Sequence, residues 1–223
     1  MGSVGGANNN TNDYSDVDSR TTQMSEEDKR QVGGGDWENR YFQSSNAFDI
    51  NEALRVVARD GGDERAELEK RLRRIKSDAD VQETLKTIDA MDRNMKPLNK
   101  NIRVVRLADN EYLHAVLNAC GVNTNGIWGK LRDADTLANI KSKIVGAKIF
   151  EHGYMSTTYN LSLDDSAFRG RPVKLDMDVS KGTKAMFSPT NDESEMVLAR
   201  KSGYTIKDVY TDKDGYLVLS VKV

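Results

Sequence analysis

The chain has 223 residues, a length that allows one or two domains. With 37% hydrophobic and 30% charged residues it is polar for a globular protein, so part of it is not expected to join a core. The formal net charge of −2 argues against bulk attraction to nucleic acid or to anionic membranes, and one cysteine and two histidines exclude an internal disulfide framework and a Cys- or His-rich metal site. No apolar run approaches the ~18 residues of a membrane span, and the Asn-rich start is not a signal peptide, which predicts a soluble protein.

The excess polarity lies at the N-terminus. Residues 1–45 combine an Asn run, an acidic Ser/Thr-rich stretch and a Gly triplet with only scattered apolar side chains, too few to offset the loss of chain entropy on folding. We therefore predict a disordered, low-complexity tail or linker over residues 1–45. Residues 38–44 resemble a viral-protease cleavage tag with one change; this stretch is either a cloning scar or a coincidence, and it is left out of the fold prediction.

Residues 46–98 show the apolar spacing of helices in three consecutive segments. The apolar positions are Ile50, Leu54 and Val57, then Leu68, Leu72 and Ile75, then Val81, Leu85, Ile88 and Met95. Each set repeats at three- or four-residue steps, or at seven, and glycines or a proline end the first and last segments. Three amphipathic helices are therefore predicted as the helical N-terminal part of the domain.

From residue 101 on, strand patterns dominate. The stretch Ile102–Leu107 is β-branched and alternating, which is typical of a strand. Helices are predicted at 111–119 and 134–145, and further strands at 147–150, 153–157, 173–179, 184–187, 195–199, 204–210 and 216–223. Helices first and strands later indicate an α+β fold, in which N-terminal helices pack on two small, mainly antiparallel sheets. Residues 46–223 are thus predicted to form one domain, with a helical part at 46–98 and a β core at 101–223.

Because histidine and cysteine are scarce, carboxylates and arginines are the candidate chemical groups. Glu193 and Glu195 open an apolar strand, where side chains at i and i+2 share a face. They are either a solvated strand start or a carboxylate pair with a cationic partner. Ser156 and Thr157 belong to a run of three hydroxyls at another strand end, which either orients a carboxylate or is simply exposed. Arg106, inside an apolar strand, needs an anion: a bound phosphate, or an internal carboxylate such as Glu195.

In chain order these elements resemble the R-S-E class of mono-ADP-ribosyltransferases, which includes the enzymatic components of clostridial binary toxins. The resemblance runs from about residue 88 to residue 209. It comprises an arginine strand at 101–106, a Ser-Thr-Ser-like motif at 153–158, a phosphate–nicotinamide loop at 168–172 and a substrate-recognition loop at 188–195. Each motif is short, but four in order with suitable spacing are hard to obtain by chance. The fold that the resemblance implies is the ADP-ribosyltransferase fold, with NAD in a cleft between the two sheets.

The resemblance also implies a role for each matching residue. Arg106 would hold the pyrophosphate and ribose side of NAD. Ser156 would hydrogen-bond Glu195 and fix its direction, and Glu195 would bond the 2′-hydroxyl of the nicotinamide ribose. Glu193 would face the acceptor, and in this family Glu at that place goes with arginine as the target. The remaining NAD contacts would be Thr157 in support of the nicotinamide pocket, Phe168 stacked near nicotinamide, Arg171 on a phosphate, and Gly153 with its backbone near the nicotinamide amide.

The activity that these roles imply is NAD-dependent transfer of ADP-ribose to arginine side chains of a target protein, with release of nicotinamide and no metal. Such a protein would be a toxin, an effector or a phage enzyme that acts in the cytoplasm of a host or target cell, with its N-terminal tail available to a delivery or virion protein. Neither nucleic acid nor a membrane is an expected partner. Leu107, where the family often has a second basic residue, and Thr158, in place of the third serine, depart from the pattern. Three alternatives remain: NAD hydrolysis, a catalytically inactive module of the same fold, and a nucleic-acid-binding effector that uses Arg71–Arg74.

Overall fold

The structure is a computed structural model that describes Tyr41 and residues 46–60, 64–159, 161, 170–187 and 195–223. The tail predicted for residues 1–45 lies outside the described residues except for Tyr41, so the tail and the domain boundaries stay predictions. Within the described part of the chain, no helix has the length and apolar character needed to cross a membrane.

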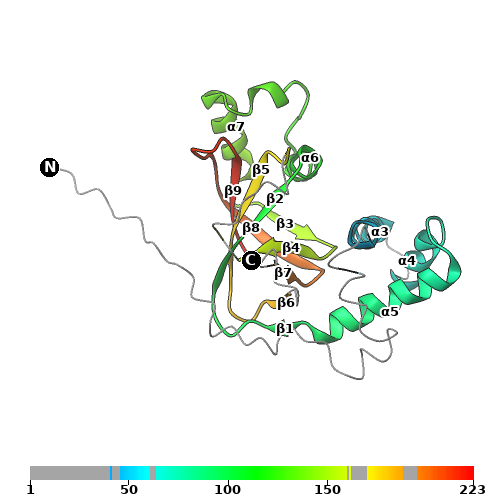
Figure 1. The fold of residues 1–223 in the computed structure, drawn as a ribbon. Coiled ribbons are helices and arrows are strands. Elements are labelled where there is room, and N and C mark those ends of the chain that lie inside the picture. Colours follow the sequence, from blue (N-terminus) through cyan, green and yellow to red (C-terminus); the bar gives the residue numbers. More distant parts are fainter. Residues whose placement is uncertain (1–40, 42–45, 61–63, 160, 162–169, 188–194) are drawn as a thin grey trace.

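Three helices form a layer on one side of the molecule: α3 (Asn46–Asp60), α4 (Glu64–Leu72) and α5 (Asp78–Asn94) (Figure 1). Helix α5 begins after Ser77, whose hydroxyl accepts a hydrogen bond from the Asp80 amide and satisfies one of the free N–H groups of the first turn. The apolar faces meet in one core that also contains Tyr41 and Tyr154. The predicted helical spacing is thus confirmed except at Ile75, which follows the end of α4 and is 60% exposed.

The basic run Arg71–Arg74, which begins on α4 and continues into the turn after it, is partly neutralised. Arg73 forms ion pairs with Glu69 at 2.7 Å and with Asp78. Lys70 pairs with Glu67 at 3.3 Å. These contacts fit a solvated helix face better than a surface prepared for nucleic-acid phosphates.

In the part of the chain that the structure describes, hydrogen bonding joins nine strands in the order β1-β6-β7-β4-β2-β5-β9-β8-β3. Their bounds are β1 (Lys96–Pro97), β2 (Ile102–Ala108), β3 (Lys148–Glu151), β4 (Met155–Thr158), β5 (Val173–Val179), β6 (Lys184–Phe187), β7 (Glu195–Leu198), β8 (Ser202–Thr211) and β9 (Leu217–Lys222). All pairs are antiparallel except β5 with β9.

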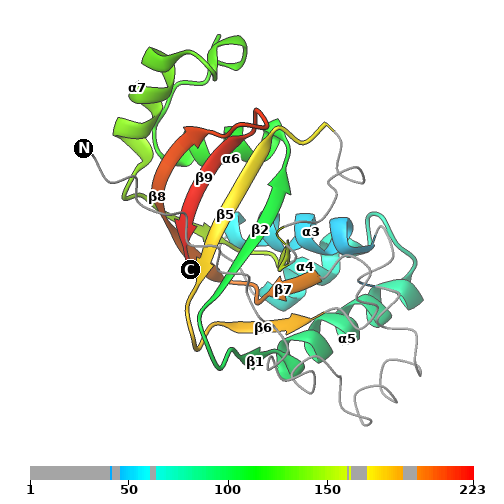
Figure 2. The ribbon, with the colours of Figure 1, turned by 60° about the vertical axis from the view of Figure 1, so that its left-hand side comes forward.

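The sheet consists of two groups of strands. One group is β1-β6-β7-β4 and the other is β2-β5-β9-β8-β3. Among the described residues, the ladder between β2 and β4, which joins the groups, consists of one residue pair, Val105 with Thr158. Figure 2 shows β1, β6 and β7 running across the direction of β2, β5, β9 and β8. The α+β class is confirmed. The two predicted sheets correspond to these two groups, but the groups are joined into one sheet through the pairing of β2 with β4. Pro97, predicted only to end a helix, lies in edge strand β1, where its missing N–H leaves no sheet bond unmade.

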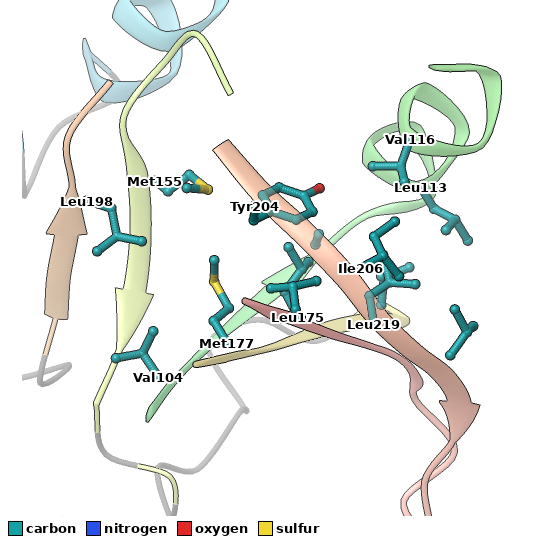
Figure 3. Close-up of a cluster of buried hydrophobic side chains, with 14 of the residues drawn as sticks. Val104, Leu113, Val116, Met155, Leu175, Met177, Leu198, Tyr204, Ile206 and Leu219 are labelled. Atoms are coloured by element: carbon teal, nitrogen blue, oxygen red, sulfur yellow. The ribbon is translucent and has the colours of Figure 1, made fainter. Parts of the chain in front are cut away.

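A second core fills the space between the strand groups and helices α6 (Asn110–Ala119) and α7 (Ala134–Ile144). Figure 3 shows Leu113 and Val116 of α6 near Ile206 and Leu219 of the strands, with Met155 and Leu198 from the other group. Both helices have an aspartate cap: Asp109 and Asp133 each accept a backbone N–H from the first turn. The first cap follows directly after β2, so α6 starts beside the strand that carries Arg106.

Candidate active site

The buried Tyr41 hydroxyl lies near three of the predicted site residues, Arg106, Ser156 and Glu195. Tyr41 is 1% exposed, its hydroxyl accepts a hydrogen bond from Asn51 Nδ2 at 3.2 Å, and its ring packs edge-to-face on Tyr154 with centroids 5.6 Å apart. Burial raises the pKa of the Tyr41 phenol above its ordinary value of 10.0, and the Glu195 carboxylate raises it further. The hydrogen bond from Asn51 acts in the opposite direction and lowers that pKa, as do Arg106 and a hydrogen bond to Ser156. Residues on β2, β4 and β7 therefore lie near enough to this hydroxyl to affect its pKa.

Arg106 retains hydrogen-bonding capacity inside the protein. Its Nη1 donates to the Ser156 carbonyl oxygen at 2.8 Å, whereas its Nε is buried and has no hydrogen-bond partner among the described residues. Arg103, three residues earlier on β2, points to the opposite face, where Asp176 binds its Nε at 2.7 Å and its Nη2 at 2.6 Å. Of these two arginines on one strand, Arg106 is therefore the one with a buried donor left over for an anion.

Ser156 and Glu195 lie on the same face of neighbouring strands. Ser156 pairs with Val197 and Thr158 pairs with Glu195, so Ser156 and Glu195 are diagonal neighbours. Thr157 points to the opposite face, is 4% exposed and donates its hydroxyl to the Met196 carbonyl at 2.6 Å. Its placement therefore fits support of the pocket wall rather than direct contact with a ligand.

The glycine of the predicted motif is packed against helix α3. A Cβ atom at Gly153 would lie 2.8 Å from Asn51 Oδ1, a distance that side chains do not tolerate. The Gly153 N–H donates to Glu151 Oε1 at 2.8 Å, and the next N–H, of Tyr154, donates to Asn51 Oδ1 at 2.7 Å. Both backbone donors are thus engaged within the protein, so a contact of Gly153 with nicotinamide would have to use its carbonyl oxygen.

A second arginine, Arg55, reaches the site from α3. Its guanidinium binds the Glu151 carboxylate through Nε at 2.8 Å and Nη2 at 3.2 Å. Both Arg106 and Arg55 lower the pKa of the nearby Tyr112 phenol, which burial raises. The Tyr112 hydroxyl in turn lies 2.6 Å from that of Tyr204. The guanidinium groups of Arg55, on α3, and Arg106, on β2, therefore both lie near Tyr112.

The other predicted contacts are only partly described. Arg171 follows the phosphate–nicotinamide loop, and its Nη1 lies 3.5 Å from the carbonyl oxygen of Leu107, next to Arg106 on β2. Glu193 and Phe168 lie outside the described residues.

Sequence reasoning missed Tyr41, Asn51, Arg55 and Glu151. Asn51 and Arg55 are four residues apart, which puts two polar side chains on one face of an otherwise amphipathic helix. That spacing was available as a signal. Tyr41 carried no such signal, because it lies in the stretch that resembled a cleavage tag.

A helical layer on two groups of strands, with an arginine, a serine and a glutamate on three neighbouring strands, is the architecture of an ADP-ribosyltransferase. The chain belongs to the ADP-ribosyltransferase exoenzyme family, whose model matches residues 15–222, and within it to the R-S-E class of mono-ADP-ribosyltransferases. NAD is the substrate of this family. Among the described residues, no group of three or more His, Cys, Asp or Glu is placed to hold a metal ion.

Solved structures share this fold at low sequence identity. The C3 exoenzyme of Clostridium limosum is 24% identical, with a TM-score of 0.63 over 91% of this chain and 87% of its own. The toxin Plx2a of Paenibacillus larvae is also 24% identical, with a TM-score of 0.58 over 90% and 87%. BECa of a C. perfringens binary enterotoxin, whose structure contains NADH, is 20% identical, with a TM-score of 0.60 over 90% of this chain and 44% of its own. No curated protein sequence matches the chain.

Proposed function

We propose that this protein transfers ADP-ribose from NAD to arginine side chains of a target protein and releases nicotinamide. ADP-ribosyl transfer follows from the family, whereas the arginine target and the residue roles below are the proposal. The observation that carries it is the arrangement of three side chains on neighbouring strands. Arg106 donates to the Ser156 carbonyl oxygen at 2.8 Å, Ser156 is a diagonal neighbour of Glu195, and the buried Arg106 Nε has no partner among the described residues. A buried cationic donor favours an anion, and the pyrophosphate of NAD supplies one.

Three arginines are assigned to the phosphates of NAD. Arg106 and Arg55 both lower the pKa of the Tyr112 phenol. Arg171 Nη1 lies 3.5 Å from the carbonyl oxygen of Leu107 on β2. Planar guanidinium groups suit phosphate oxygens, which accept two parallel hydrogen bonds. With three arginines, the site can bind pyrophosphate although Leu107 stands where the family often has a second basic residue on the strand.

The nicotinamide end is assigned to the motifs that flank these arginines. Phe168 keeps its predicted role of stacking near nicotinamide. Thr157 holds the pocket wall through its bond to Met196, and Gly153 offers its carbonyl oxygen to the amide. Ser156, on the same face as Glu195, directs that carboxylate toward the ribose.

The reaction exchanges the bond between ribose C1′ and the nicotinamide nitrogen for a bond to an arginine nitrogen. Nicotinamide is cationic within NAD, so it leaves with the bonding electron pair as a neutral molecule and needs no general acid. The Glu195 carboxylate accepts a hydrogen bond from the ribose 2′-hydroxyl and stabilises the positive charge that develops on the sugar. The incoming guanidinium is a poor nucleophile while it is protonated, and Glu193 takes up its proton as the new bond forms.

The acceptor role of Glu193 is tested by Glu193→Gln, with labelled NAD and an arginine-rich acceptor protein. Label transfer should be lost while nicotinamide release largely persists, because water replaces the acceptor. Glu195→Gln is the matched control and should lose both activities. Retention of label transfer in Glu193→Gln would overturn the acceptor role. A folded wild-type protein that neither transfers label nor cleaves NAD would instead support the inactive module.

We place the action of this toxin-family protein in the cytoplasm of a target cell, since the reaction needs both free NAD and a protein acceptor. The acceptor is a protein with an accessible arginine. Residues 1–45 are proposed to connect the catalytic domain to a delivery or virion protein. Removing residues 1–36, which keeps Tyr41, should then leave transfer in solution unchanged and abolish delivery in a cell-entry assay.

A further inference from the structure

A carboxylate next to the predicted motif is unusual in its burial. Among the described residues, Glu151 is the only Asp, Glu, Lys, Arg or His in the buried class, at 6% exposed. It is the last residue of edge strand β3, and helix α3 lies beside the ends of β3 and β4 (Figure 1). Burial of an ionised carboxylate is costly unless charge and hydrogen bonds compensate it, and a hydrophobic side chain of similar size is often at least as stabilising. The presence of a carboxylate here therefore suggests a role other than stability.

Glu151 fixes two parts of the site at once. Its carboxylate binds Arg55 through both oxygens, at 2.8 Å and 3.2 Å, and Oε1 also accepts the Gly153 N–H at 2.8 Å. The first contact reaches helix α3. The second fixes the backbone just before the strand that carries Ser156. One side chain therefore sets the position of a guanidinium relative to the serine motif.

The bond to Glu151 leaves part of Arg55 available. A guanidinium carries five N–H groups, and Glu151 occupies the Nε–H and one on Nη2. The Arg55 side chain is 33% exposed, so its remaining donors are not sealed in the core. Arg55 and Arg106 both lower the pKa of the Tyr112 phenol, so both guanidinium groups lie near that side chain.

We propose that Glu151 is a positioning residue for NAD binding, which it serves by holding Arg55 in the orientation that meets the NAD phosphates. The proposal rests on the proposed function, in which Arg55 and Arg106 share the pyrophosphate. Glu151 itself touches neither NAD nor the acceptor. Its substitution should therefore weaken NAD binding only through Arg55, and it should leave the chemical step close to normal.

The test measures KM for NAD and kcat for nicotinamide release in the full chain with Glu151→Gln, Arg55→Ala and the double variant. The Gln side chain can still accept the Gly153 N–H but carries no charge for Arg55. Glu151→Gln should raise KM for NAD about 10- to 100-fold, the cost of a lost charge-assisted hydrogen bond, with kcat changed less than about threefold. The double variant should be no worse than Arg55→Ala, because Glu151 acts through that residue. Additive losses in KM, or an unchanged KM in Glu151→Gln, would overturn the proposal.

Two further variants separate positioning from a general loss of structure. Asp176→Asn is the matched control, because Asp176 binds Arg103 through two hydrogen bonds, as Glu151 binds Arg55, but on the face of β2 opposite to Arg106. It should leave KM for NAD within about twofold of wild type. Arg55→Lys keeps the charge but cannot form the two-bond contact, so it should raise KM nearly as much as Arg55→Ala, whether or not Glu151→Gln folds. A wild-type KM in Arg55→Lys would overturn the proposal, whereas a wild-type protein that does not bind NAD at all would overturn the proposed function instead.

Discussion

Replacing Gly153 by alanine tests whether helix α3 and the serine motif fit together as closely as the structure indicates. The added Cβ would lie 2.8 Å from Asn51 Oδ1 and 3.3 Å from Asn51 Cβ and Cγ. The Asn51 side-chain amide is held at both of its polar atoms. Its Oδ1 accepts the Tyr154 N–H at 2.7 Å, and its Nδ2 donates to the Tyr41 hydroxyl at 3.2 Å. The only relief available to Asn51 is movement away from both partners.

The expected cost follows from those two hydrogen bonds. Each is worth about 0.5–1.5 kcal/mol, and a buried donor left unsatisfied costs about 1–3 kcal/mol. Together they give a loss of about 2–4 kcal/mol in the free energy of unfolding, equivalent to a decrease of about 5–15 °C in Tm for a chain of this size. Because the displaced Asn51 also positions Tyr41, KM for NAD should rise as well.

Thermal and urea unfolding measure the first effect, and the initial rate of nicotinamide release measures the second. Gly129→Ala is the matched control, because nothing lies within 4 Å of a Cβ at Gly129 and its φ is not in the left-handed region. It should change stability by no more than about 0.5 kcal/mol. If Gly153→Ala were as stable and as active as Gly129→Ala, the close packing of α3 on the serine motif would be wrong.

Two further substitutions test the polar groups of the site. Tyr41→Phe keeps the ring on Tyr154 but removes the hydroxyl, and should lower kcat/KM for NAD cleavage about tenfold. Tyr41→Phe should also reduce the loss of stability above pH 10. Burial raises the pKa of Tyr41, so above pH 10 the folded state keeps a phenol proton that the unfolded state releases. Each such phenol lowers the free energy of unfolding by about 1.4 kcal/mol per pH unit in that range. Urea unfolding between about pH 9 and 11 measures the slope, and an equal slope in both proteins would contradict the burial of Tyr41. Arg106→Lys should weaken NAD binding about 10- to 100-fold while Arg103→Lys leaves it unchanged; equal effects in titrations with NAD would refute the assignment of the two faces of β2.

Features set by local periodicity could be predicted from the sequence. Ile50, Leu54 and Val57 recur on one helical face, and all three are buried in the helical layer. The alternation in Ile102–Leu107 likewise predicted strand β2, which runs one residue further, to Ala108. Ile75 continued the helical pattern but is exposed, because α4 ends at Leu72 and spacing alone does not specify where a helix stops.

The polar partners of the site could not be predicted in this way. Tyr41 lies in a short polar stretch with no periodicity, and its partners Asn51 and Tyr154 are brought together by a hydrogen bond between residues 103 positions apart. Glu151 ends an edge strand whose pattern is compatible with exposure. It is buried because α3 covers the strand end and Arg55 supplies the opposite charge.

The sequence by itself determined the amphipathic faces and the order of the arginine, serine and glutamate motifs along the chain, since both are properties of neighbouring residues. Only the tertiary structure decided which polar groups share one space. The register of β4 on β7 makes Ser156 and Glu195 diagonal neighbours, and the packing of α3 adds Tyr41, Asn51 and Arg55. These contacts join segments far apart in the sequence, where the position of each side chain depends on the packing of the whole fold rather than on its neighbours in the chain.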